Sequence, residues 1–222
     1  MDEESDIFTS MLKIKTFVFN PVQVNTYLLY DETKEAVIID CGAHTDSEKK
    51  QLSDFISEKK LTLKHVLNTH LHFDHILGNE YLYETYGLKP EYNPKDEEMP
   101  GLKEGIIKFG FATFKCKFIF AEQYLEDGAI ISFGKTSLQA LATPGHSPGS
   151  LSFYSKKDAC VFTGDALFRF DIGRTDLWGG DSKQLMHSIE TKLYTLPGVT
   201  VVYPGHEESS NIGEEVEYNP YV

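Results

Sequence analysis

The 222-residue sequence has only three cysteines and no Cys-x-x-Cys pair. Cys41, Cys116 and Cys160 lie far apart, which excludes a dense disulfide framework. Sparse, unpaired cysteines are typical of free thiols in a reducing compartment, so we expect a cytoplasmic protein.

Long hydrophobic runs and basic clusters are also missing. No apolar stretch approaches the roughly 20 residues that cross a bilayer, and the acidic N-terminus lacks the basic and apolar regions of a secretory signal. Lys and Arg number 21 against 34 Asp and Glu, which gives a formal net charge of −13. Because a nucleic-acid binder needs a basic face, we expect neither nucleic acid nor membrane as a partner.

The patterned part of the chain begins at Met11. We therefore expect residues 1 to 10 to form a loose arm and residues 11 to 222 a single catalytic domain. Alternating β-branched and aromatic residues predict strands at 12–19, 24–30, 36–40, 63–67, 117–120, 129–132, 136–142, 150–154, 159–163 and 200–203. This order, with helices between the strands, favours a mixed α/β sandwich over a doubly wound sheet.

Helices are predicted between and after these strands. They cover 45–60 with Asp46 as the cap, a stretch that runs through Tyr86, a short piece at 102–109, and 182–196. Residues 89–101 contain three prolines and several acids, so we expect a surface loop there.

The segment Thr69–His75 reads THLHFDH and carries four potential metal ligands. His70 and His72 are two residues apart at a strand end, so both rings point to the same side. Asp74 and His75 follow where the chain turns into a helix, and they can face a neighbouring ion. Neutral imidazole and carboxylate are zinc ligands, so this spacing predicts a metal site rather than a polar loop with chance histidines.

Three later residues stand where an apolar strand gives way to a glycine turn: His146, Asp165 and His206. Functional side chains are commonly placed on such loops over a rigid scaffold, and a carboxylate at Asp165 could bridge two ions. The remaining histidines lack metal-type neighbours, and we expect them to be structural or exposed: His44, His65 and His187.

Taken in their order along the chain, these candidate ligands and their flanking residues resemble the motifs of the metallo-β-lactamase superfamily. The match runs through Asp40, the THLHFDH segment, His146, Asp165 and His206, from about residue 12 to the C-terminus. Three stretches resemble the single-domain glyoxalase II-like (hydroxyacylglutathione hydrolase-like) hydrolases more closely: NTYL at 25–28, GDALF at 164–168 continuing to 172–176, and 212–215 followed by 219–220. The resemblance implies a four-layer αββα sandwich.

The resemblance also implies two divalent metal ions, expected to be zinc, with iron or manganese as alternatives. One ion would be held by His70, His72 and His146, and the other by Asp74, His75 and His206, with Asp165 as the bridge. Asp74 would also be catalytic, because it would accept a hydrogen bond from a metal-bound hydroxide.

Two departures from the family pattern bear on the substrate. Cys41 stands where proline is common after Asp40, which leaves a thiol near the site. By the resemblance, full-length thioesterases carry a helical domain that helps to bind glutathione, and we expect this chain, which ends at Val222, to lack it. This absence leaves the substrate open but not the chemistry.

The expected reaction is hydrolysis of an acyl thioester, such as a 2-hydroxyacyl glutathione, by a hydroxide shared between two metals. Arg174 is predicted to contact the thiol carrier; alternatively, it is a surface arginine paired with Asp171 or Asp176. The main rival is a persulfide dioxygenase, which would use a single iron and fewer of these ligands. A lactonase, a β-lactamase and a non-catalytic metal-binding protein are further alternatives. The acyl group and the oligomeric state are not indicated.

Overall fold

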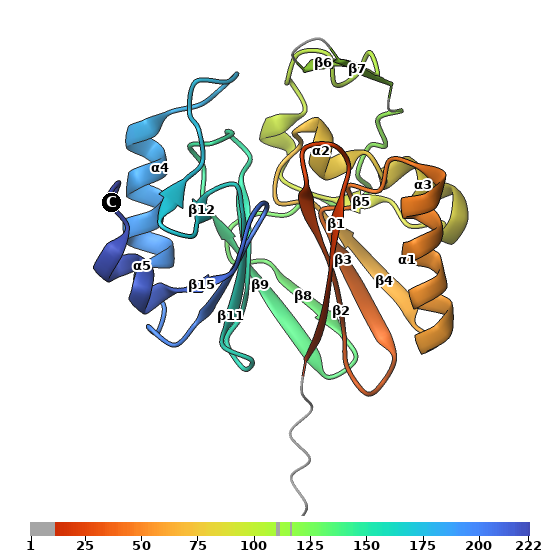
Figure 1. Ribbon diagram of the computed structural model, residues 1–222, viewed down its shortest axis with the longest axis horizontal. Helices are drawn as coiled ribbons and strands as arrows, with labels where there is room; N and C mark the ends of the chain where they lie inside the picture. The colour runs from red at the N-terminus through yellow and green to blue at the C-terminus, as the bar shows by residue number, and fades with distance from the viewer. Residues whose placement is uncertain (1–11, 110–111, 116) are drawn as a thin grey trace, which may run out of the picture.

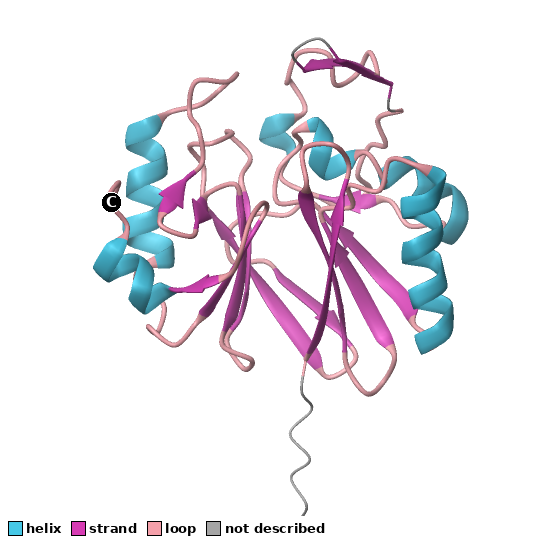
Figure 2. Cartoon of the chain, viewed as in Figure 1, coloured by secondary structure: helices cyan, strands magenta, loops and turns pink. Residues whose placement is uncertain are grey.

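The computed structural model describes residues 12–109, 112–115 and 117–222. The expected arm at residues 1 to 10 and Cys116 lie outside the described residues. Two sheets pack face to face, and helices cover their outer faces (Figure 1, Figure 2). This arrangement confirms the predicted αββα layers, whereas the single domain at 11–222 stays a prediction.

The first sheet has the order β1-β2-β3-β4-β5. Its strands are β1 (Lys13–Phe19), β2 (Val24–Tyr30), β3 (Glu35–Ile39), β4 (Thr62–Leu67) and β5 (Pro90–Glu91). β1, β2 and β3 form the antiparallel part, and β4 joins β3 in parallel after the helix α1 (Asp46–Lys59). The short helix α2 (Phe73–Ile76) and α3 (Asn79–Tyr86) follow β4, with α3 beside α1 on the outer face (Figure 1).

The second sheet has the order β15-β14-β11-β10-β9-β8. Its strands are β8 (Ile130–Phe133), β9 (Thr136–Ala142), β10 (Leu151–Ser155), β11 (Cys160–Gly164), β14 (Val201–Pro204) and β15 (Ser210–Asn211). Its outer face is covered by α4 (Ser182–Ser188), which continues into a π-helical turn at Ile189–Leu193, and by α5 (Ile212–Tyr218). Two small hairpins complete the fold, β6 (Ile106–Phe109) with β7 (Ala112–Lys115) and β12 (Leu167–Phe168) with β13 (Asp171–Ile172).

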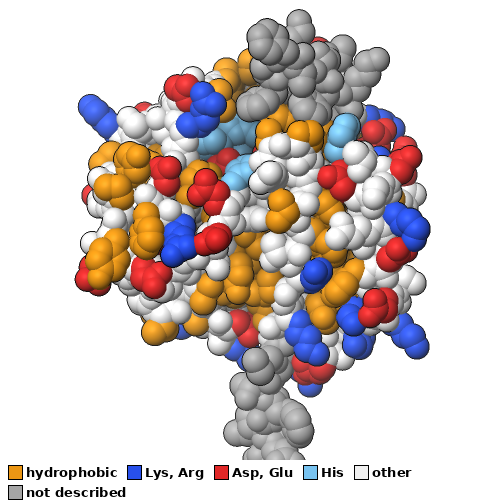
Figure 3. All heavy atoms as spheres, viewed as in Figure 1, with side chains coloured by type: hydrophobic (Ala, Val, Ile, Leu, Met, Phe, Trp, Pro, Cys, Tyr) orange, Lys and Arg blue, Asp and Glu red, His pale blue; other side chains and the backbone are white. Residues whose placement is uncertain are grey.

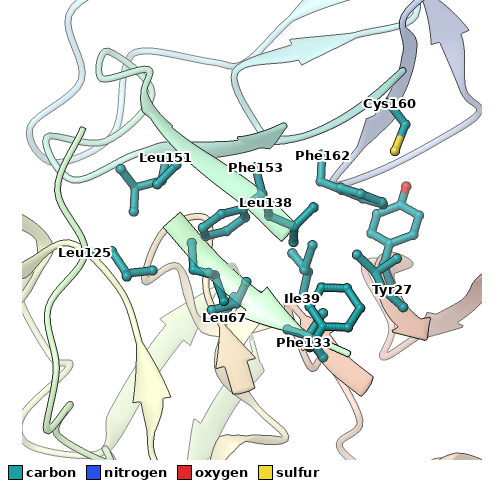
Figure 4. Close-up of a cluster of buried hydrophobic side chains, with 14 residues drawn as sticks. Tyr27, Ile39, Leu67, Leu125, Phe133, Leu138, Leu151, Phe153, Cys160 and Phe162 are labelled. Atoms are coloured by element: carbon teal, nitrogen blue, oxygen red, sulfur yellow. The ribbon is translucent and has the colours of Figure 1, made fainter. Parts of the chain in front are cut away.

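Period-two alternation divides each inner strand between two cores. Leu29 faces the space between the sheets, while its neighbour Leu28 packs toward α1. Between the sheets, Leu29 belongs to a cluster that includes Phe153 and Phe162 of the second sheet, both of which are labelled in Figure 4. Both strand faces are apolar because each sheet is covered on both sides.

Several sequence predictions about local structure were wrong. Residues 102–109 form a turn followed by β6 instead of a helix, and 117–120 form no strand. The cap of α1 is Thr45, not Asp46, because the Thr45 hydroxyl accepts from the Glu48 N–H while the Glu48 carboxylate accepts from the Thr45 N–H. The expected loop at 89–101 contains β5 and a 3₁₀ turn at Pro94–Asp96. Within the described residues, no helix is both long and apolar enough to span a bilayer.

Replacing Phe153 with alanine should lower the free energy of unfolding by about 3–5 kcal/mol, because the sheets would close only partly around the space of a fully buried ring. Urea unfolding followed by circular dichroism measures the loss. The control is Phe120→Ala, whose ring is half exposed and whose removal should cost less than about 1 kcal/mol. Equal losses in the two variants would contradict the inter-sheet core.

Candidate metal centre

The candidate site lies at one edge of the sandwich, where strands of both sheets end. The first sheet supplies residues from the loop after β4 and from α2, namely His70, His72, Asp74 and His75. The second sheet supplies residues after β9, β11 and β14, namely His146, Asp165 and His206. Figure 3 shows histidine side chains gathered in a hollow at the top of the molecule. Residues up to 136 positions apart in the sequence thus meet only after the sheets pack.

His70, His72 and His146 form one convergent group. His72 Nδ1 lies 2.9 Å from His70 Nε2 and 2.8 Å from His146 Nε2. Burial and the neighbouring imidazoles lower the pKa of His70 well below its usual value, and burial and His146 lower that of His72 to about 3. The rings of His70 and His72 are therefore neutral at physiological pH, which is the form that binds a metal.

Asp74, His75 and His206 form a second group. Asp74 Oδ2 lies 3.4 Å from His75 Nε2 and 3.2 Å from His206 Nε2. Burial lowers the pKa of His75, but the carboxylates of Asp74, Asp165 and Asp40 outweigh burial and raise it well above the usual value. Such an excess of buried negative charge around one imidazole favours a cation in this group.

Asp165 lies between the two groups. Its Oδ1 is 3.3 Å from His75 Nε2, and its Oδ2 is 3.5 Å from His146 Nε2 and 3.7 Å from His206 Nε2. Burial raises the pKa of Asp165, but the charge and the hydrogen bond of the neighbouring His75 imidazole outweigh burial and lower that pKa well below the usual value. The carboxylate is therefore ionised and faces both groups, which is the position expected of a bridge.

Hydrogen bonds at the far side of the rings fix which nitrogen faces the centre. His146 Nδ1 lies 2.7 Å from the Arg174 carbonyl oxygen, so this nitrogen donates the hydrogen bond and Nε2 faces the centre. His70 Nδ1 similarly faces the Thr69 hydroxyl, and His75 Nδ1 faces the Asp40 carboxylate. Partners of this kind orient metal-binding histidines and increase their basicity.

A cavity of about 640 Å³ opens above the cluster. Its apolar lining includes Met99, Leu102, Phe168 and Trp178. Arg174 lines the cavity too, but its guanidinium forms two 2.7 Å hydrogen bonds to the Asp176 carboxylate. This pairing is one of the two alternatives considered from the sequence, and a contact between Arg174 and substrate stays a prediction.

The other histidines and the cysteine flagged in the sequence lie outside the cluster. His65 Nδ1 is 2.6 Å from a carboxylate oxygen of Glu91, and none of the metal-type groups found among the described residues includes His44, His65 or His187. Cys41 is fully buried, and burial raises the pKa of its thiol to about 12. That thiol is therefore protonated and inert at neutral pH.

Sequence reasoning missed the polar residues that support the ligands. Thr69 donates its hydroxyl to Asp40 over 2.7 Å, and Asp96 accepts hydrogen bonds from the loops that carry the histidines. Thr69 could have been found from its position beside His70 after an apolar strand. Asp96 gave no signal, because it lies in a stretch rich in proline and acidic residues that is typical of surface loops.

Comparison with known proteins agrees with this geometry. The family model of the metallo-β-lactamase superfamily matches residues 19–206. The chain is 37% identical over 209 residues to the persulfide dioxygenase ETHE1 of Homo sapiens, covering 91% of this chain and 73% of that protein. It is 33% identical over 213 residues to the hydroxyacylglutathione hydrolase GloC of Haemophilus influenzae, covering 95% and 98%.

Solved structures show the same fold. The B3 metallo-β-lactamase BLEG-1 superimposes with a TM-score of 0.82 at 34% identity, covering 94% of this chain and 99% of that one. TTHA1623 in a di-iron-bound form gives a TM-score of 0.81 at 32% identity, covering 94% and 100%. The His/Asp cluster is thus compatible with a binuclear site, and this chain belongs to the metallo-β-lactamase superfamily.

Proposed function

We propose that this protein is a binuclear metal-dependent hydrolase that cleaves glutathione-type or related acyl thioesters. The observation that carries the proposal is the convergence of five histidines and two aspartates from both sheets, five of which line one cavity. The similarity to GloC, over nearly the full length of both chains, supports the hydrolytic assignment.

Two buried atoms indicate that the cluster fits metal ions. His75 Nε2 and Asp165 Oδ1 are inaccessible to solvent, and neither has a hydrogen-bond partner among the described residues. Unsatisfied buried polar atoms are costly, and a cation between them would remove that cost. The mixture of imidazole and carboxylate suits zinc, and it accepts iron or manganese as well.

The ligand assignment follows the two groups. His70, His72 and His146 would hold one ion, Asp74, His75 and His206 the other, and Asp165 would bridge them. A pair of bound ions supplies a water of lowered pKa and polarises a substrate carbonyl. The Asp74 carboxylate, which lines the cavity, would accept a hydrogen bond from the attacking water and orient it.

The cavity walls would position the substrate. Met99, Leu102 and Trp178 offer apolar contacts to the acyl chain, and they exclude water from the reacting carbonyl. The Arg174 guanidinium would contact a carboxylate of the thiol carrier, which would compete with Asp176 for it. Thioesters suit such a site because a thiolate leaves without first taking a proton.

A persulfide dioxygenase is the second candidate, and it is favoured by the 37% identity to human ETHE1. The geometry of the second group argues for the hydrolase. Asp74, His206 and Asp165 are all present and all face His75 or each other, although a single-iron enzyme would not need a second position.

The decisive measurement combines metal content with two assays. We expect two divalent ions per chain, release of free thiol from a 2-hydroxyacyl glutathione, and loss of that activity after chelation. The reverse pattern would be one iron per chain with oxygen uptake on glutathione persulfide, and it would establish the dioxygenase. No turnover of thioesters, lactones or β-lactams by metal-loaded protein would count against a hydrolase.

Replacing Gly205 with alanine should weaken binding of metal by about 10–100-fold, a loss typical of changes beside the ligands. A Cβ atom at this position would lie 2.2 Å from Asp165 Oδ1 and 2.8 Å from His75 Cε1, so the carboxylate would be displaced. The control is Gly198→Ala, where the nearest atom would be 3.5 Å away. Competition with a chromophoric chelator measures both variants, and unchanged affinity in Gly205→Ala would refute the bridging position of Asp165.

A further inference from the structure

Asp96 is a buried carboxylate in a segment that otherwise resembles a surface loop. It ends the 3₁₀ turn Pro94–Asp96, and its side chain is inaccessible to solvent. Within the described part of the chain it forms no ion pair. Three neutral groups donate hydrogen bonds to it instead, from Leu71, Ser147 and Gly149. These donors offset the free-energy cost of burying the carboxylate, which would be large without them.

The three donors come from two loops that carry candidate metal ligands. The Leu71 N–H, between His70 and His72, donates to Asp96 Oδ2 over 3.2 Å. The Ser147 hydroxyl, next to His146, donates to the same oxygen over 2.8 Å, and the Gly149 N–H donates to Oδ1 over 2.6 Å. One side chain thus ties the loop of His70 and His72 to the loop of His146.

Two other contacts join the same loops. His72 Nδ1 lies 2.8 Å from His146 Nε2, and the Leu151 N–H donates to the Thr69 carbonyl over 2.8 Å. At the Asp96 side the fit is tight, because a Cβ atom on Gly149 would lie 2.8 Å from the Asp96 Cγ. A shift of Asp96 would therefore move both loops relative to each other.

The chemistry of the three donors requires a carboxylate rather than an amide. An ionised aspartate only accepts hydrogen bonds, so it satisfies all three donors at once. An asparagine of the same shape would turn its NH₂ toward at least one donor, which leaves that pair unsatisfied in a buried place.

We propose that Asp96 is a positioning residue that sets the affinity of the His70–His72–His146 group for its metal ion. The proposal rests on the metal centre proposed above but not on the substrate. It gives a role to the segment 89–101, which contributes none of the seven candidate ligands.

Asp31 supplies a matched control. It too is fully buried, and it accepts hydrogen bonds from Thr33, Lys135 and Thr136. It lies after β2, at the end of the sandwich opposite the candidate site (Figure 1). Asp31→Asn should therefore lower stability by the same kind of mechanism without any effect on metal binding.

The test measures two zinc dissociation constants by chelator competition, and the urea stability of the metal-free protein, in wild type, Asp96→Asn and Asp31→Asn. For Asp96→Asn we expect one ion to bind about 10–100-fold more weakly and the other to change little. For Asp31→Asn we expect lower stability and two unchanged affinities. A loss of stability alone in Asp96→Asn, or an equal loss of affinity for both ions, would overturn the proposal.

A double-mutant comparison identifies the affected ion. Added to His146→Ala, which already damages the first group, Asp96→Asn should cause no further loss of affinity for the remaining ion. Added to His206→Ala, it should have its full effect; the opposite pattern would refute the assignment.

A milder variant keeps the test decisive if Asp96→Asn fails to fold. Ser147→Ala removes one donor and leaves the carboxylate, and it should weaken the same ion by a smaller factor; unchanged affinity would overturn the proposal. Wild-type protein that binds two ions but hydrolyses no thioester would refute the substrate alone, because the affinities still test Asp96. Wild-type protein that binds no zinc would overturn both.

Discussion

The three hydrogen bonds accepted by the Asp40 carboxylate are the interaction on which the candidate site depends. Asp40 follows β3 with a left-handed backbone, φ +55°, a conformation that aspartate tolerates better than most residues. Its carboxylate accepts from the N–H and the hydroxyl of Thr69 and from His75 Nδ1. Through Thr69 it also orients His70. One buried side chain therefore fixes the start of the ligand segment and the nitrogen that the His70 and His75 rings present to the centre.

The sequence predicted those residues of the candidate site that lie directly after a strand. His146, Asp165 and His206 each stand where an apolar strand stops, and the THLHFDH segment follows β4 directly. A sandwich whose strands end along one edge brings such positions together. The positions of these residues in the sequence were therefore enough to predict that their side chains meet. The helical pattern between strands predicted the helices at 45–60 and 182–196, whereas the two helical layers were implied by the resemblance to the family.

The remainder depended on contacts that no local pattern encodes. Residues 102–109 form a turn and a strand because β6 pairs with β7, and a short apolar stretch does not distinguish a strand from a helix. Asp96 stands among prolines and acids, and only the packing of two distant loops makes it a buried acceptor. The cap of α1 shifted by one residue because Thr45 and Glu48 satisfy each other's backbone N–H groups.

The hydrogen bond between His146 and the Arg174 carbonyl couples the shape of the cavity to the orientation of a candidate metal ligand. Arg174, Leu177 and Trp178 belong to a cavity wall, yet the backbone of that wall also orients a candidate metal ligand. Changes in this loop that adapt the wall to another molecule would also tilt the His146 ring. In evolutionary terms, the cavity wall and the candidate metal centre are coupled, so a new specificity would arise most easily from side-chain changes that leave the loop's backbone in place.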